Sequence, residues 1–239
     1  MLDAALMPPI TVQAEVSKIV KLTHDVRELT FRLKNPATLD FIAGQYVNFR
    51  IVRPDQPKPA SRMYSIGSAP SESGVLRLVY NYVGGPGTTY LDALQIGETV
   101  ECKAPFGHFV LDLESTRDVA FVATGTGVAP FYSMLLEYLP KNIDRKMTLV
   151  WGVREPRDLY YQAELDALKE RYANFHYAMA MSRGDWRGTT GRVTAIFPKI
   201  FPTLDNLEVY ICGSTAMITD MKSLCDAAGG CPFHREKYF

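Results

Sequence analysis

One glycine-containing stretch has the residue types needed to bind a phosphate group. An apolar run at residues 119–123 is followed by Gly125, Thr126 and Gly127, and then by Pro130. The short run is typical of a buried strand, and Pro130 suits the first turn of a helix. A glycine turn between a strand and a helix N-terminus presents N–H groups and a positive dipole end to a phosphate. Because Pro130 replaces the third glycine of the dinucleotide fingerprint, a purely structural turn remains an alternative.

A second stretch places polar groups alternately along an extended segment, at Arg62, Met63, Tyr64 and Ser65. Arg62 could hold a phosphate through two parallel hydrogen bonds. Tyr64 could present its ring to a flat ligand, and Ser65 could donate a hydrogen bond at the edge of that ligand. The alternative is an edge strand whose polar side chains face water.

Two further positions carry candidate chemistry. Gly85 and Gly87 precede a short helical pattern that starts at Thr88, which makes a second candidate anion site. Cys212 lies on a turn just before a helix that Ser214 would cap. A cysteine is more often a small buried hydrophobic residue, so a structural role for Cys212 stays open.

The elements that must position these residues differ between the two halves of the chain. Short strands separated by glycine and proline breakers predict an antiparallel barrel or sandwich in the first half. Strands alternate with helices in the second half, which predicts a parallel sheet with helices on both faces. The predicted strands are residues 11–23, 26–34, 46–52, 63–67, 75–83, 99–104, 109–113, 119–123, 147–153, 175–181 and 207–211. The predicted helices of the second half are residues 130–139, 159–168, 193–197 and 216–228.

Composition limits the class of protein. A chain of 239 residues can hold two modest domains. Its 26 basic and 26 acidic residues balance, which argues against a nucleic-acid or anionic-membrane partner. The N-terminus lacks the pattern of a signal peptide, and no apolar run is long enough to span a bilayer. The four cysteines are scattered, so we expect free thiols, a reducing cytoplasm and no metal site.

Taken together, these motifs resemble the ferredoxin–NADP reductase superfamily in order and spacing. The resemblance covers essentially the whole chain, and it is strongest to the flavin and pyridine-nucleotide module of bacterial oxygenase reductases. It implies an N-terminal antiparallel Greek-key β-barrel for the flavin at residues 1–114, and a C-terminal Rossmann-like α/β domain for the nicotinamide nucleotide at residues 115–239. The motifs are Arg62-x-Tyr64-Ser65, Gly85-x-x-Thr88, Gly125-Thr126-Gly127-Val128-Ala129-Pro130 and Cys212-Gly213.

The resemblance also implies roles for individual residues. Tyr64 lies against the flavin ring, Ser65 lies near its redox-active nitrogen, and Arg62 contacts the phosphates, with FAD preferred over FMN. Cys212 and Glu236 lie near the nicotinamide. The implied catalytic residues are Ser65, Cys212 and Glu236. The implied cofactor-binding residues are Arg62, Met63, Tyr64, Ser65, Gly85, Gly87, Thr88, Gly125, Thr126, Gly127, Arg154, Ser182, Arg183, Arg192, Cys212, Gly213, and the terminal aromatics Tyr238 and Phe239, either of which would stack on the flavin.

The choice between NADH and NADPH stays open at this stage. Arg154, Ser182, Arg183 and Arg192 fall after predicted strands, where arginines can bind the 2′-phosphate of NADP. The stretch from residue 185 to 193 is also similar to NADH-linked oxygenase reductases, and the arginines could simply be solvated.

The implied reaction is hydride transfer from NAD(P)H to bound FAD, followed by electron transfer to a ferredoxin or an oxygenase component. One alternative is a flavin reductase that releases free reduced flavin. Another is a nucleotide-binding regulatory subunit that does not turn over.

Overall fold

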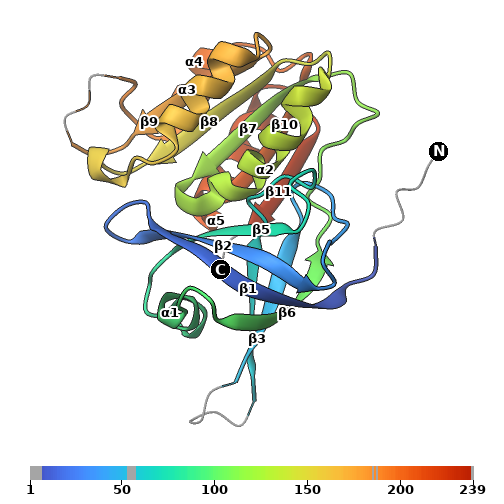
Figure 1. Ribbon diagram of the computed structural model, residues 1–239. Coiled ribbons are helices and arrows are strands. Elements are labelled where there is room, and N and C mark those ends of the chain that lie inside the picture. The colour runs from blue at the N-terminus through green and yellow to red at the C-terminus, as the bar shows by residue number, and fades with distance from the viewer. Residues whose placement is uncertain (1–6, 53–57, 185, 187, 238–239) are drawn as a thin grey trace. The chain divides into compact units, whose positions relative to one another are not determined.

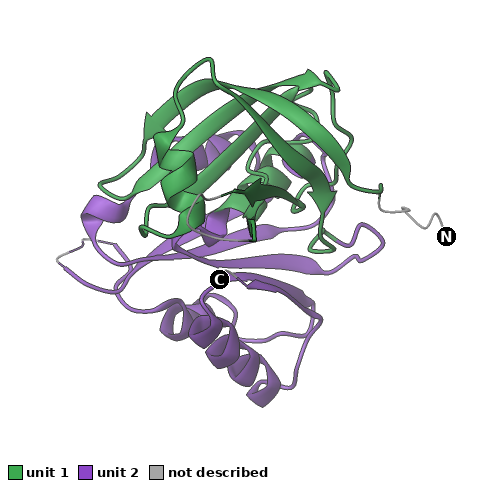
Figure 2. Ribbon diagram, turned by 90° about the horizontal axis from the view of Figure 1, so that it is seen from below, with its two compact units in different colours: residues 1–111, 129–137 green, residues 112–128, 138–239 purple. Residues whose placement is uncertain are grey.

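The computed structural model describes residues 7–52, 58–184, 186 and 188–237. The chain divides into two compact units, shown in different colours in Figure 2. Unit 1 comprises residues 1–111 and 129–137, and unit 2 comprises residues 112–128 and 138–239. The domain boundary after Glu114 stays a prediction, and each unit is described by itself below.

The described residues of unit 1 form a six-stranded antiparallel sheet in the order β4-β3-β6-β1-β2-β5 (Figure 1). An isolated bridge between Ile66 and Leu78 joins the end of β4 to β5, so the sheet curls into the predicted barrel. The elements are β1 (Ile10–Lys21), β2 (Val26–Asn35), β3 (Tyr46–Ile51), β4 (Ala60–Ser65), β5 (Val75–Asn81), α1 (Pro86–Ala93) and β6 (Thr99–Phe106).

Alternation of apolar and polar residues along the strands explains which side chains form the core of unit 1. In β1, Val12, Ala14 and Val16 are buried while their neighbours are exposed or half-buried, because successive side chains of a strand point to opposite faces. Phe31 and Phe49 fill the interior from β2 and β3. The barrel core is therefore specified by the period of the sequence.

The predicted strand at residues 109–113 is wrong. These residues pair with no strand among the described residues, although Phe109 and Leu111 are buried. The Phe109 ring instead packs on Phe131, with ring centroids 5.7 Å apart. Side chains satisfy the backbone of Asp112, whose N–H donates to Tyr210 Oη at 2.9 Å. Burial without strand pairing misled the sequence-based prediction.

The described residues of unit 2 form a five-stranded parallel sheet in the order β11-β10-β7-β8-β9. The chain runs outward from β7 to β9 and then returns to the other side of β7. This reversal creates a topological switch point between β7 and β10, where ligands bind in such sheets. The strands are β7 (Asp118–Thr124), β8 (Met147–Val153), β9 (Phe175–Met181), β10 (Leu207–Gly213) and β11 (Phe233–Lys237).

Helices follow each of the strands β7 to β10. They are η1 (Gly125–Gly127) with α2 (Val128–Tyr138) and η2 (Leu139–Lys141), η3 (Pro156–Asp158) with α3 (Gln162–Arg171), α4 (Val193–Ile200) and α5 (Thr215–Ala227). Residues of α4 and α5 pack on one face of the sheet, against Val122 and Ile211. Ser214 caps α5 as predicted, and its hydroxyl accepts from the Met217 N–H.

Two local predictions in unit 2 need correction. Helix α3 begins later than the predicted residue 159, because Tyr160 and Tyr161 are buried and Tyr161 has a left-handed backbone with φ of 56°. The strand β11 was not predicted, because four of its five residues are charged or histidine and it lies at an edge of the sheet. Hydrogen bonding to β10 makes this segment a strand, although its composition does not indicate one.

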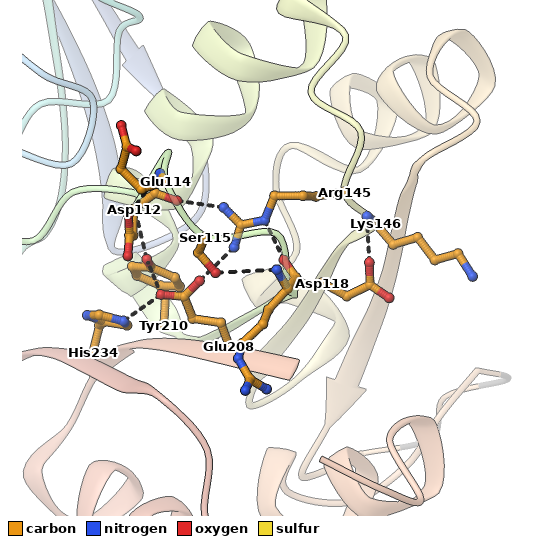
Figure 3. Close-up of polar contacts among 10 residues, drawn as sticks. Asp112, Glu114, Ser115, Asp118, Arg145, Lys146, Glu208, Tyr210 and His234 are labelled. Carbon is orange, nitrogen blue, oxygen red and sulfur yellow. Dashed lines mark hydrogen bonds and ion pairs between the residues drawn. The ribbon is translucent and has the colours of Figure 1, made fainter. Parts of the chain in front are cut away.

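A buried polar network holds the start of unit 2 (Figure 3). Arg145 Nη2 donates to Glu208 Oε2 at 2.6 Å, and both side chains are almost fully buried. Arg145 Nη1 also donates to the Asp112 carbonyl at 2.7 Å. On the other side of the carboxylate, Tyr210 Oη donates to Glu208 Oε1 at 2.9 Å, and His234 Nε2 lies 2.7 Å from the same oxygen.

The environment of Glu208 keeps it ionised. Burial alone would raise the pKa of this carboxyl, but hydrogen bonds from Tyr210, Ser115 and His234 and the charge of Arg145 outweigh burial and lower the pKa. The carboxylate therefore ties β10, β11 and the segment that follows residue 111 into one assembly.

Among the described residues, no helix combines the length and apolar character that crossing a bilayer would require.

Candidate flavin and nucleotide sites

The predicted flavin-binding residues of unit 1 lie together on β4. Ser65 is buried, Tyr64 is half-buried, and Arg62 and Met63 are exposed. The Tyr64 ring packs edge-on against Phe49, with ring centroids 6.0 Å apart. Because β4 alternates, Arg62 and Tyr64 project from one side of the strand and Met63 from the other. The exposed Met63 is thus placed apart from the Arg62–Tyr64 pair.

The glycine turn before α1 packs directly on this pair. A Cβ atom added at Gly87 would lie 2.3 Å from Tyr64 Oη and 2.8 Å from Arg62 Cγ. A side chain at this position would have to displace Tyr64 or Arg62, so the close approach favours glycine. The structure thereby brings residues 85–88 and β4 together, although 20 or more positions separate them in the sequence.

The hydroxyl of Thr88 stabilises the turn itself. It donates to the Gly85 carbonyl at 3.3 Å and accepts from the Val83 N–H at 3.4 Å. Gly85 is the N-cap residue of α1, and it has no side chain to accept a hydrogen bond from the first N–H groups of the helix. The first N–H groups of the helix therefore retain capacity for an anion.

These residues fit a flavin with a phosphate-containing tail. Arg62 supplies a permanent positive charge, the start of α1 supplies backbone donors, and Tyr64 supplies a ring with a hydroxyl. Burial raises the pKa of Tyr64 to about 12, and the charge of Arg62 opposes this only in part. The phenol is therefore protonated at neutral pH and can donate a hydrogen bond.

In unit 2, the turn after β7 packs on the end of β10. A Cβ atom added at Gly127 would lie 2.3 Å from the Cys212 carbonyl oxygen and 2.8 Å from its carbonyl carbon. A Cβ atom at Gly213 would lie 2.2 Å from Thr124 Oγ1. The residues of both predicted motifs therefore meet at the switch point of the sheet, and Cys212 is fully buried there.

Glu236 lies beside Cys212 in the sheet. The two residues are register partners in the parallel pairing of β10 with β11. This places the acidic residue at the same end of the sheet as the glycine turn. The other predicted C-terminal residues, Tyr238 and Phe239, lie outside the described residues.

Arg154 follows β8, and Ser182 and Arg183 follow β9; these residues and Arg192, which were considered for NADP recognition, are all exposed. The Arg183 N–H donates to the Arg154 carbonyl at 2.7 Å, and the Ser182 N–H donates to the Val153 carbonyl at 3.1 Å. Arg192 is the N-cap residue of α4. Exposed arginines fit a phosphate ligand and fit solvation equally, so the nucleotide preference stays open.

Comparison with known proteins identifies the family. Residues 13–111 match the model of the oxidoreductase FAD-binding domain, and residues 121–223 match that of the oxidoreductase NAD-binding domain. The chain is 34% identical over 238 residues to ferredoxin–NADP reductase B of Sorangium cellulosum, covering 95% of this chain and 97% of that protein. The chain belongs to the ferredoxin–NADP reductase family. It is an NAD(P)H-dependent flavoprotein oxidoreductase with FAD as its cofactor, as the motifs predicted.

Other members of this family are larger proteins. The reductase is 31% identical over 209 residues to reductase component 1 of terephthalate 1,2-dioxygenase from Comamonas sp., covering 86% of this chain and 61% of that one. The crystal structure of Amycolatopsis cytochrome P450 reductase GcoB superposes with a TM-score of 0.86 at 28% identity, over 96% of this chain and 70% of that one. The chain therefore spans about three fifths of the Comamonas protein.

Sequence reasoning missed two aromatic residues that bond to the glycine turn of the candidate nucleotide site in the reductase. Trp151 Nε1 donates to the Gly125 carbonyl at 2.9 Å, and Tyr160 Oη donates to the same oxygen at 3.2 Å. Both residues are buried, and buried aromatic residues are ordinarily core residues. Nothing in their spacing could have indicated contact with the glycine turn.

Proposed function

We propose that this reductase transfers electrons from NAD(P)H to a protein acceptor, which is a ferredoxin or the iron–sulfur component of an oxygenase. The observation that carries the proposal is the pairing of each glycine turn with its partner motif: Gly87 packs on Arg62 and Tyr64, and Gly127 packs on Cys212. The Sorangium relative, named as a ferredoxin–NADP reductase, supports the ferredoxin. The Comamonas relative, named as a dioxygenase reductase component, supports the oxygenase.

The roles of the side chains follow from their chemistry. When bound, FAD supplies two-electron and one-electron redox chemistry that amino-acid side chains lack. Arg62 and the start of α1 bind its phosphates, Tyr64 packs on the flavin ring, and the Ser65 hydroxyl donates a hydrogen bond near the reacting position. These residues provide distance and orientation.

In the nucleotide domain, the turn Gly125–Gly127 binds the pyrophosphate of NAD(P)H, and Cys212 and Glu236 orient the nicotinamide. Cys212 acts through packing, because its side chain is fully buried and an apolar environment does not favour a thiolate nucleophile. Glu236 supplies a negative charge beside it. The exposed residues Arg154, Ser182, Arg183 and Arg192 decide between NADH and NADPH.

We also propose a cytoplasmic location. All four cysteines are free thiols, as a reducing compartment would keep them. Alkylation of the thiols in intact cells, before lysis, would show whether they are reduced in vivo.

The function can be tested by rapid mixing of the purified protein with NADH and with NADPH. Bleaching of the visible absorbance, followed by reduction of an added ferredoxin, is the expected result. Loss of the yellow colour on dialysis, with free FMN acting as a substrate, would instead support a flavin reductase that releases its product. A colour that neither nucleotide bleaches would leave only a binding subunit.

Replacing Arg62 by alanine should lower the flavin content of the purified protein. A hydrogen bond to a charged group contributes about 1.5–3 kcal/mol, so the affinity for FAD should fall by at least about tenfold. The measurement is the ratio of visible to ultraviolet absorbance, together with the dissociation constant of FAD for the stripped protein. Arg50→Ala is the control, because Arg50 is an exposed cation on the neighbouring strand β3. Equal FAD affinity in both variants would contradict the assigned role.

Replacing Cys212 by alanine should slow the bleaching step more than it lowers flavin content, because the thiol lies in the nucleotide domain. A loss of about three- to tenfold is expected from less exact orientation of the nicotinamide. Rapid mixing at saturating nucleotide measures the rate. Cys225→Ala is the control, because Cys225 is also buried but lies on α5. A Cys212→Ala variant that bleaches at the wild-type rate would remove the residue from the mechanism.

A further inference from the structure

One backbone carbonyl in the nucleotide domain receives donors from three parts of the chain. The carbonyl of Gly125 accepts from Trp151 Nε1 at 2.9 Å and from Tyr160 Oη at 3.2 Å. It also accepts from the N–H of Val128, which closes the turn η1. Trp151 belongs to β8, and Tyr160 belongs to the segment between η3 and α3. The first residue of the glycine turn is therefore attached to neighbouring elements by two side chains.

The two aromatic donors are rigid. Trp151 is 0% exposed and Tyr160 is 6% exposed. Their rings pack edge to face with centroids 4.7 Å apart, and Tyr160 packs in the same manner on Tyr161 at 5.1 Å. Each ring is thus restrained by its neighbours. Donors restrained in this way hold the Gly125 carbonyl in one orientation. Flexible surface side chains would instead move with the carbonyl if it changed orientation.

Orienting this carbonyl also orients the next N–H group. The peptide bond is planar and trans, so the N–H of Thr126 points opposite to the carbonyl of Gly125. Gly125 has a φ of 53°, which leaves its peptide free to adopt other orientations unless something holds it. The Trp151 and Tyr160 donors direct the Gly125 carbonyl toward the interior and the following N–H in the opposite direction.

We propose that Trp151 and Tyr160 are positioning residues for the pyrophosphate of NAD(P)H. They hold the Gly125 carbonyl inward, so that the backbone N–H groups of the turn stay arranged to receive the phosphates. The inference rests on the proposed role of this turn in nucleotide binding. The polar groups of both side chains are essential to it, because phenylalanine would fill a buried apolar site without donating to the carbonyl.

The test uses the FAD-loaded reductase and three variants. Trp151→Phe and Tyr160→Phe each remove one donor and retain a ring. Tyr177→Phe is the matched control, because Tyr177 Oη donates at 2.5 Å to the exposed Asp166 in the same domain. Calorimetry with ADP-ribose measures pyrophosphate binding without turnover. Isotope labelling of glycine and threonine amides reports the conformation of Gly125, Thr126 and Gly127 directly, in the absence of nucleotide.

Each donor variant should weaken ADP-ribose binding by about three- to tenfold, the effect of one neutral hydrogen bond. The KM for the nucleotide should rise by a similar factor, while kcat and flavin content stay near wild type. The three amide resonances should shift in both donor variants and stay unchanged in Tyr177→Phe. If the two residues had a purely structural role, the donor variants would lower kcat as well as raise KM, or Tyr177→Phe would show the same changes.

Two results would overturn the inference. One is wild-type amide resonances and ADP-ribose affinity in Tyr160→Phe, which is the variant that leaves no cavity. The other is an equal loss of affinity in Tyr177→Phe. Failure of the wild-type protein to bind ADP-ribose would overturn the proposed function instead, and the amide resonances would still decide whether the two residues orient the turn.

Discussion

Replacing Arg145 by alanine should lower the free energy of unfolding of the nucleotide domain by about 3–5 kcal/mol, because it leaves a buried carboxylate without its partner. The Arg145 and Glu208 side chains are 3% and 2% exposed, with 2.6 Å between Nη2 and Oε2. The variant also removes donors from the carbonyls of Asp112 and Arg117. Urea unfolding followed by tryptophan fluorescence measures the loss, since both tryptophans, Trp151 and Trp186, belong to unit 2.

The matched control is the exposed pair of Lys222 and Asp226 on α5, whose side chains are 46% and 56% exposed. Lys222→Ala should cost no more than about 0.5 kcal/mol, as is usual for exposed helical pairs. The double variant Arg145→Met with Glu208→Leu should recover part of the loss, because it removes the unpaired charge. A cost for Arg145→Ala as small as that for Lys222→Ala would show that Glu208 is not buried as described.

Replacing Gly127 by alanine should weaken nucleotide binding by about ten- to hundredfold while leaving flavin content unchanged. The added Cβ atom would lie 2.3 Å from the Cys212 carbonyl oxygen, and a backbone atom cannot rotate away as a side chain can. Overpacking of this kind costs about 1–3 kcal/mol, which corresponds to the stated loss if the turn relieves the strain by moving away from β10. Calorimetry with NAD⁺ and NADP⁺ measures the change.

Gly67→Ala is the control for this variant. An added Cβ atom there would lie 3.4 Å from the Arg77 carbonyl oxygen, an ordinary contact, and Gly67 belongs to unit 1. Nucleotide binding should match the wild type in that variant. If Gly127→Ala also bound nucleotide with wild-type affinity, the close contact between the glycine turn and Cys212 would have no role in nucleotide binding.

The sequence by itself determined the two-part architecture and indicated the residues of both candidate sites. The predicted strands at residues 147–153 and 175–181 agree fully with β8 and β9, because both segments are short and predominantly apolar, as parallel strands covered by helices are. The short strands separated by glycine and proline breakers predicted an antiparallel barrel or sandwich in the first half. The glycine motifs were recognisable because a tight turn and a close backbone approach restrict the residue types that fit.

Only the tertiary structure decided which segments meet. The contact of Gly87 with Tyr64, the register of Glu236 beside Cys212, and the donors from Trp151 and Tyr160 to Gly125 all join residues that are distant in the sequence. The same holds for the predicted strand at residues 109–113, where the side chains of Tyr210 and Arg145 bond the backbone N–H and carbonyl of Asp112. The physical reason is that propensity and periodicity report the local backbone and its buried face, whereas the partner of a side chain depends on the order of the strands in the sheet.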